Sequence, residues 1–270
     1  WPAAEAAALG RRFGVNRSRF WAKPVPCVGW ILLNTAKGVF RNNVRLRQAV
    51  SWAVDRRTYA AQAGPYAGSP WARLFPPSFP GLRTSPAPYS ATPQIAQAQR
   101  LAKGHFGSGK VVLAYLANSS ANTAQAEVVR RSLVRLGFEP SNITMKGLSG
   151  TYFEFPPRSG WDLATNTGWC AQYPDPLDFF QTLLGDGVLL PDLITSPSYR
   201  RKIATAAKLV GNARLRAFGR LELDIDRNLV PVVPMRTYNN RYFFSKRVDP
   251  RSLSYSGVYS DWSIPALALK

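Results

Sequence analysis

The sequence GWCAQYPDP occupies residues 168–176, and this stretch does more than any other to decide the fold class. It places two large aromatic side chains, an amide and a proline-bounded turn directly after residues 161–165, which read as a β-strand. Ligand sites of α/β proteins commonly lie in loops that follow the carboxyl end of a strand. Trp169 and Gln172 are therefore candidate ligand contacts, and a buried aromatic loop that binds nothing is the alternative.

Apolar periodicity on both sides of this loop predicts a sheet with helices packed against it. Short apolar runs indicate strands, and apolar residues at spacings of three and four indicate amphipathic helices. Thr92 followed by Pro93 predicts a helix start, and Gly137 predicts a helix stop. The alternation of strands and helices is typical of an α/β layer. The predicted strands are 25–33, 111–116, 142–146, 161–165, 229–235 and 241–244, and the predicted helices are 44–61, 92–104, 122–136, 177–184, 198–210 and 213–228.

The chain has 270 residues, is 46% hydrophobic and carries a formal net charge of +20. It is long enough to bury a substantial core. The charge permits nucleic acid, an anionic surface or an acidic ligand as a partner. The Lys and Arg residues are scattered in pairs along the predicted helices, however, which favours a solvated surface. No uncharged apolar run of 18 residues or more occurs, and the Ala-rich residues 1–13 have no basic leader, so the sequence predicts neither a membrane span nor an intact signal peptide.

Three patterns suggest enzyme chemistry, and each has a structural explanation that we prefer. Residues 104–110 match the spacing of a phosphate-binding P-loop, but Val111 stands where a hydroxyl is needed and a strand is predicted to follow. His105 has no carboxylate or nucleophile near it in the sequence. Asp175 and Asp178 stand three apart, but Asp175 lies between two prolines and is expected to cap the next helix. We therefore expect no catalytic residues and no enzyme activity.

The two cysteines, Cys27 and Cys170, lie far apart in the sequence. Together with the single histidine they are too few for the usual zinc clusters, so no metal site is expected. They form either one disulfide or two buried thiols, and the residues alone leave both open.

The loop at 168–176 resembles the GW-x-A-x-YPDP signature of bacterial extracellular solute-binding proteins of family 5, the peptide-binding components of ABC importers. The proline-rich residues 65–80 and residues 89–104 resemble further segments of that family, as do the final predicted helix and residues 231–235. The resemblance covers roughly residues 25 to 245, and its strength lies in the order of several moderately specific motifs. A spaced family pattern is also matched at Asn34, Phe40, Val44, Arg45, Arg47, Gln48, Ala49, Ala53, Asp55 and Arg56.

This resemblance implies a fold and a domain arrangement. The fold class is α/β, namely the second lobe of a periplasmic-binding-protein-like fold (class II, type C), with a mixed sheet flanked by helices. Residues 1–26 would be a remnant of the first lobe and the crossover, residues 27–238 the C-terminal ligand-binding lobe, and residues 239–270 the segment that returns to the first lobe. Because most of the N-terminal lobe would be missing, aromatic side chains around Trp30, Trp169 and the tail that contains Tyr255, Tyr259 and Trp262 are expected to be exposed.

The resemblance also implies a function. The chain would capture a peptide or related small solute and present it to an ABC permease in the membrane, without a cofactor. It would be extracellular, either lipid-anchored at the cell surface or periplasmic. No nucleic acid is expected as a partner. A basic module that binds nucleic acid or an anionic surface is the alternative, and it is motivated only by the charge of +20.

Five residues are implied as ligand contacts. Trp169 would supply a flat apolar wall and Gln172 a hydrogen bond, and Tyr173 would shape the loop beside Cys170. Tyr238 lies at the predicted return to the first lobe and would add a phenol to the cleft. Oligopeptide-binding relatives place an aspartate at the position of Gln172 to bind the α-amino group of the ligand. An amide carries no compensating charge, so a free peptide N-terminus would bind less well here.

A disulfide is implied as well. In several oligopeptide-binding relatives the positions that match Cys27 and Cys170 are joined. An exported protein meets an oxidising compartment in which such a bond persists. The resemblance therefore predicts a Cys27–Cys170 disulfide.

Overall fold

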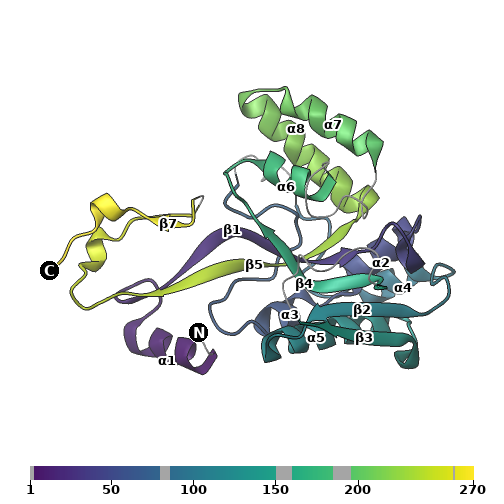
Figure 1. The fold of residues 1–270 in the computed structure, drawn as a ribbon, viewed down its shortest axis with the longest axis horizontal. Coiled ribbons are helices and arrows are strands. Elements are labelled where there is room, and N and C mark those ends of the chain that lie inside the picture. The colour runs from purple at the N-terminus through teal and green to yellow at the C-terminus, as the bar shows by residue number, and fades with distance from the viewer. Residues whose placement is uncertain (1–2, 80–85, 150–159, 185–195, 258) are drawn as a thin grey trace.

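A five-stranded mixed sheet forms the centre of the molecule, in the order β3-β2-β4-β1-β5 (Figure 1). β2 runs parallel to β3 and to β4, whereas β1 runs antiparallel to β4 and to β5. The computed structural model describes residues 3–79, 86–149, 160–184, 196–257 and 259–270. The strands of the sheet are β1 Phe20–Leu33, β2 Val111–Leu116, β3 Ile143–Leu148, β4 Leu163–Cys170 and β5 Val232–Phe243.

Helices cover both faces of the sheet, and a separate apolar cluster fills each interface. Neighbouring residues of a strand point to opposite faces, so Trp30 is buried in one cluster and Ile31 in the other. From Val25 to Leu33 β1 is buried on both faces, and its sequence there is a continuous apolar run. The Ile31 side carries α2 Val44–Ala53, α3 Arg56–Ala61, α4 Ile95–Ala102 and α5 Ser120–Leu136, and the Trp30 side carries α6 Pro176–Leu184, α7 Pro197–Ala207 and α8 Gly211–Asp224. The predicted α/β class with a mixed sheet between helices is confirmed.

β1 and β5 continue past the other strands as a two-stranded ribbon (Figure 1). β4 accompanies β1 only as far as Cys27, and from there to Phe20 the first strand pairs with β5 alone. Helix α1, Ala3–Phe13, lies at the far end of the ribbon, where the rings of Phe13 and Phe243 are 5.1 Å apart. Both proposed lobe boundaries, at residues 26 and 238, fall within the stretch where β1 and β5 pair.

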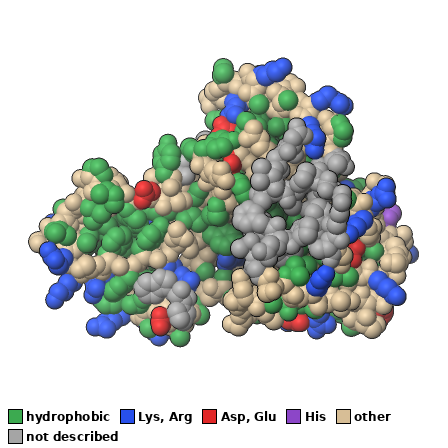
Figure 2. Space-filling view, in the orientation of Figure 1, with side chains coloured by type: hydrophobic (Ala, Val, Ile, Leu, Met, Phe, Trp, Pro, Cys, Tyr) green, Lys and Arg blue, Asp and Glu red, His purple; other side chains and the backbone are tan. Residues whose placement is uncertain are grey.

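The residues after β5 fold back along the ribbon through an aromatic cluster, and hydrophobic side chains cover this part of the surface in Figure 2. Its short strands β6 Tyr255–Ser256 and β7 Asp261–Trp262 pair with each other. The expected exposure is wrong for Trp30 and Trp262, whose exposed fractions are only 2% and 8%, whereas Tyr259 is 71% exposed. Other parts of the same chain cover Trp30 and Trp262. Trp262 packs against the rings of Trp21, Tyr242, Phe244 and Tyr255.

Three predicted elements have other boundaries in the structure. The single helix predicted over 44–61 is two helices, because Asp55 ends the first and caps α3 by accepting from the N–H of Thr58 at 2.9 Å. Helix α4 has Gln94 as its N-cap, so the predicted start at Thr92 is wrong. The strands predicted at 229–235 and 241–244 are one strand, β5.

Helix α5 begins at Ser120 because the hydroxyl of Ser119 accepts from the N–H of Asn122 at 3.2 Å, so its start lies before the predicted one. It ends at Gly137 as predicted, where a φ of 128° suits only glycine. Within the part of the chain that the structure describes, no helix is both long and apolar enough to span a bilayer.

Candidate functional site

A disulfide joins β1 to the end of β4. Cys27 and Cys170 are partners in the antiparallel register, their Cα atoms lie 4.0 Å apart, and their sulfur atoms are bonded. The implied pairing is therefore confirmed. The two strands approach closely beside it, because a Cβ at Gly168 would lie 2.6 Å from the carbonyl oxygen of Val28. Glycine at position 168 is thus required for the pairing.

β4 separates from β2 before it reaches the disulfide. It pairs with β2 only through its first two residues, whereas it pairs with β1 as far as Cys170. The N–H of Ala171 donates to the carbonyl of Pro26 at 2.9 Å, which places it on the β1 side. The backbone N–H and C=O groups of successive residues point alternately to the two edges of a strand. Because the N–H of Ala171 points towards β1, the backbone groups of Gly168 and Cys170 point away from β1. No described strand pairs with that edge of β4 beyond β2.

One buried carboxylate holds the loop that follows β4. Asp178 lies on α6 and is 5% exposed. Its Oδ2 accepts from the indole N–H of Trp169 at 2.6 Å and from the backbone N–H of Gln172 at 3.2 Å. The ring of Trp169 packs against the apolar cluster on the Trp30 side of the sheet. The chain itself therefore fixes the shape of this loop.

Asp175 begins α6, as predicted. Its Oδ1 accepts from the N–H of Leu177 at 2.8 Å, which satisfies one of the free amides at the helix start. It also forms an ion pair with Arg214 of α8, with 3.0 Å between Nη2 and Oδ1. Both Asp175 and Asp178 are thus engaged in holding the loop and α6 together.

Cys170, Gln172 and Tyr173 are exposed on this loop. The hydroxyl of Tyr173 donates to Oε1 of Gln181 on α6 at 2.8 Å. Partial burial raises the pKa of Tyr173, and the negative charges of Asp178 and Asp175 raise it further. The side chain of Gln172 makes no hydrogen bond to another described residue, so its amide is available to a ligand.

Tyr238 lies on the other side of β1 from Trp169. A Cβ at Gly29 would lie 2.7 Å from the hydroxyl of Tyr238, so the phenol occupies the space that a side chain at Gly29 would need. Gly29 precedes Trp30 and points to the opposite face of the sheet. Trp169 and Tyr238 therefore flank β1 from opposite faces.

Sequence reasoning missed two residues of this region. Asp178 was considered only as an acid or base, and nothing in its spacing indicates that it receives the Trp169 indole. Arg236 was not singled out, although its guanidinium stacks on the ring of Tyr238 with 3.9 Å between Cζ and the ring centroid. The only signal for it is a charged residue immediately after the predicted apolar strand 229–235.

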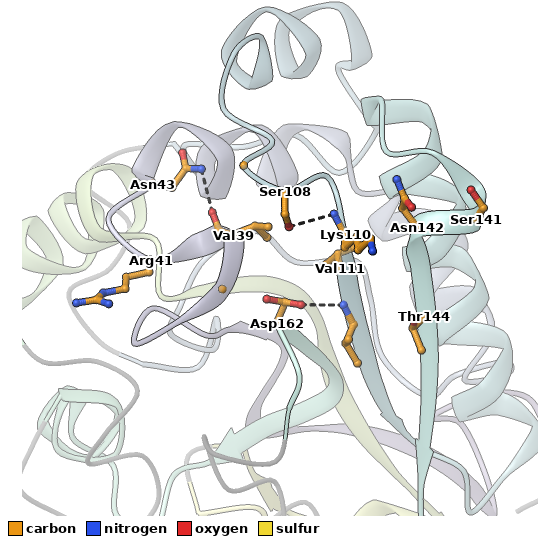
Figure 3. Close-up of a pocket in the computed structure, with 13 residues that line it drawn as sticks. Val39, Arg41, Asn43, Ser108, Lys110, Val111, Ser141, Asn142, Thr144 and Asp162 are labelled. Carbon is orange, nitrogen blue, oxygen red and sulfur yellow. Dashed lines mark hydrogen bonds between the residues drawn. The ribbon is translucent and has the colours of Figure 1, made fainter.

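A separate cavity of about 870 Å³ lies where β2 begins (Figure 3). It is lined by parts of the P-loop-like segment, and Asp162 in its wall accepts from the N–H of Val112 at 2.8 Å. Strand β2 starts at Val111, so the segment is a turn between a helix and a strand, as predicted, and lacks the helix start that holds a phosphate. Because β2 and β4 are parallel, this cavity lies at the opposite end of the strands from Gly168 and Cys170.

Residues 2–188 match the family described as bacterial extracellular solute-binding proteins, family 5 Middle. The periplasmic oligopeptide-binding protein OppA of Escherichia coli (strain K12) is 22% identical over 217 residues, which make up 77% of this chain and 40% of OppA.

Two solved structures share the fold. Clavulanic acid biosynthesis oligopeptide binding protein 2 has a TM-score of 0.78 at 20% identity, over 93% of this chain and 48% of that one. DppA from Helicobacter pylori, a periplasmic binding protein in complex with the peptide STSA, has a TM-score of 0.72 at 18% identity, over 92% of this chain and 48% of DppA. The chain thus spans about half the length of these proteins.

The same comparisons lend no support to the nucleic-acid alternative. The names of these relatives describe solute-binding and peptide-binding proteins. On the face seen in Figure 2, Lys and Arg side chains are dispersed around the outline of the molecule. A protein that follows a phosphate backbone gathers them along one face or stripe.

Proposed function

The chain belongs to family 5 of the bacterial extracellular solute-binding proteins, and we propose that it forms the second lobe of one that captures peptides for an ABC importer. Residues 27–238 are the ligand-binding lobe in this proposal, and residues 1–26 and 239–270 connect it to a first lobe. The whole protein works outside the cytoplasm and delivers its solute to a membrane permease. Its role is binding, without catalysis.

The free edge of β4 is the observation that carries the proposal. Gly168 and Cys170 direct backbone donors and acceptors away from β1, and no described strand takes them up. An extended peptide can add itself to such an edge as a further strand, and its main-chain hydrogen bonds then provide affinity whatever its sequence. The disulfide at Cys170 anchors the end of this edge to β1.

The loop after β4 supplies side chains at one end of that edge. Trp169 offers an apolar surface that Asp178 holds in place, and Gln172 offers an exposed amide. Tyr173 shapes the loop through its bond to Gln181, and Tyr238 lines the ribbon side of the cleft. Because the loop is fixed before the solute arrives, little ordering entropy is lost on binding.

The ribbon of β1 and β5 is suited to connect two lobes. Two paired strands cross out of the sheet side by side, so a first lobe attached there could rotate as a unit over the free edge of β4. Closure would exclude water from the peptide and strengthen every polar contact that it makes.

Calorimetric titration of the full-length gene product with short peptides tests the proposal. We expect one saturable site per chain, and Trp169→Ala should weaken it about tenfold or more, because an aromatic contact is lost. Tyr259→Ala, which removes a tail aromatic that is 71% exposed, is the matched control and should leave the affinity unchanged. Absence of binding by any peptide would overturn the proposed function. Equal affinities of the two variants would overturn the assignment of the site.

A further inference from the structure

Helices α7 and α8 form a hairpin that lies at the top of the molecule in Figure 1, on the Trp30 side of the sheet. Its inner face is packed, since Tyr199 and Ile203 of α7 and Phe218 of α8 are buried in the apolar cluster there. The chain reverses at Gly211, whose φ of 53° lies in the left-handed region that glycine adopts freely. The outer faces of the two helices are left towards solvent.

A groove of about 750 Å³ runs between α7 and α8 on this outer side. Its lining residues recur at spacings of three and four along each helix, so each helix contributes one continuous stripe. The floor is apolar, and it includes Ala206 and Leu221, which also pack against the buried cluster. Because Ala206 and Ala217 have small side chains, a partner could approach the backbone of both helices closely.

Unpaired cations border this apolar floor. Arg201 of α7 and Arg220 of α8 line the groove, and both are exposed. Neither forms an ion pair with a described carboxylate, whereas Lys202 pairs with Asp224 at 2.7 Å. In Figure 2 Lys and Arg side chains stand beside hydrophobic ones over this hairpin. Such a surface complements a partner that carries carboxylates on both sides of an apolar stripe.

Apolar surface continues beyond the groove at the turn of the hairpin. Leu209 lines the groove and is 40% exposed, and the next residue, Val210, is 82% exposed, more than any other large hydrophobic residue that the structure describes. The pair of Lys202 and Asp224 makes the other end of the groove polar. Single exposed hydrophobic residues are ordinary, but here two adjoin an apolar floor and extend it. The groove therefore has an apolar end and a polar end.

The shape of this surface favours a helix as the occupant. The stripes of two neighbouring helices form a groove that accepts a ridge of side chains from a third helix. An added strand would need free backbone donors and acceptors, and α7 and α8 use theirs within their own turns. A membrane surface binds apolar side chains that project outwards, whereas Ala206 and Leu221 lie at the bottom of the groove.

We propose that the groove between α7 and α8 is a docking surface for an acidic amphipathic helix of a partner protein. The apolar stripe of that helix fills the floor, and carboxylates beside the stripe pair with Arg201 and Arg220. Its more apolar end lies over Leu209 and Val210. The inference goes beyond the proposed function, because the groove contains no residue of the loop at 168–176 or of β4.

Fluorescence anisotropy of labelled peptides with the full-length gene product tests the proposal. The probe is a synthetic helix of about 18 residues, since much shorter isolated helices are marginal in water. It carries leucines at spacings of three and four and glutamates beside them. Because the chain has a net charge of +20, any acidic peptide is attracted to some extent, so a scrambled peptide of the same composition is the control. The helix should bind saturably and at least about tenfold more tightly than the scrambled peptide.

Two double variants assign the binding to the groove. Leu209→Ser with Val210→Ser should weaken the acidic helix by about tenfold, because apolar contact is lost. Arg201→Ser with Arg220→Ser should weaken it by about three- to tenfold at low ionic strength, because two exposed ion pairs are lost. Arg45→Ser with Arg57→Ser removes two exposed arginines from the other side of the sheet and should leave the affinity unchanged.

Several outcomes would overturn the proposal. These are no saturable binding of the acidic helix, equal binding of the scrambled peptide, or an equal loss in the Arg45 and Arg57 control. Sedimentation with phosphatidylglycerol vesicles covers a lipid partner, and vesicle binding that the two groove variants abolish, without binding of the helix, would assign the surface to lipid instead. All substituted residues are exposed, and thermal unfolding monitored by circular dichroism checks that each variant is folded. Titration of the groove variants with a solute peptide should match the wild type, so the proposed function is tested separately.

Discussion

The indole N–H of Trp169 donates to Oδ2 of Asp178 at 2.6 Å, and the same oxygen receives the backbone N–H of Gln172 at 3.2 Å. One carboxylate on α6 thus holds both ends of the segment from Trp169 to Gln172. Asp178 is buried, so its bonds are little weakened by competition from water. The loop is therefore held rigid by Asp178, whose side chain is itself shielded from solvent.

Removal of this carboxylate should loosen the loop and lower stability. Asp178→Ala leaves two donors without their acceptor, which should reduce the free energy of unfolding by about 1–3 kcal/mol in urea denaturation. Gln181→Ala removes the exposed partner of Tyr173 on the same helix and should change stability by less than about 0.5 kcal/mol. An unchanged denaturation midpoint for Asp178→Ala would show that the loop does not depend on it.

The disulfide should be a major contribution to stability. It closes a loop with a sequence separation of 143 residues, for which the chain-entropy relation gives about 4–5 kcal/mol. The double variant Cys27→Ser, Cys170→Ser should unfold at correspondingly lower denaturant than the oxidised protein. Non-reducing peptide mapping checks the bond directly, and recovery of two free thiols from protein purified under oxidising conditions would contradict it.

Asp226 should make the protein less stable as the pH rises. It is buried in the π-helical turn Ile225–Leu229, and burial raises its pKa well above the ordinary value, with a further contribution from the charge of Glu222. The folded state then binds this proton more tightly than the unfolded state. Stability from Asp226 is therefore present below the unfolded pKa of about 4 and is lost as the pH rises towards the folded pKa.

The isosteric variant Asp226→Asn tests this sign, because an amide does not titrate. In thermal unfolding, the melting temperature of the variant should rise relative to that of the wild type as the pH is raised from 4 to neutrality. A difference in melting temperature that stays constant over that range would contradict the raised pKa. Asp224→Asn is the neighbouring control. Burial acts to raise the pKa of Asp224, but the hydrogen bonds that it accepts from Lys202 and Asn228 lower the pKa overall.

Patterns that depend on local physics predicted the fold well. Strand β2 occupies the predicted residues 111–116, and α5 stops at Gly137, because a strand run and a glycine stop are properties of short segments. Helix starts were less predictable, since Ser119 caps α5 through its hydroxyl, whereas Gln94 stands at the N-cap position of α4 without a capping bond from its side chain. The disulfide followed from the family resemblance, whereas the residues alone could not choose between a bond and two thiols.

The site was predictable only in part, for a physical reason. Trp169 and Gln172 could be singled out because an aromatic loop after a strand is a local pattern. The role of Asp178 depends on how α6 folds back against that loop, and the ion pair of Asp175 with Arg214 forms only when α8 has packed beside α6. Hydrogen-bond partners so distant in sequence leave no trace in local spacing.

Calorimetric titration of Gln172→Asp in the full-length gene product tests the central claim, that the loop at 168–176 reads a bound peptide, most directly. The probes are a peptide and its N-acetylated form. A carboxylate forms a stronger, charge-assisted bond to an ammonium group than an amide does, so the variant should shift the affinity ratio towards the free amine, by about tenfold. An affinity ratio identical to that of the wild type would contradict the account, because the loop would then not contact the amino end of the ligand.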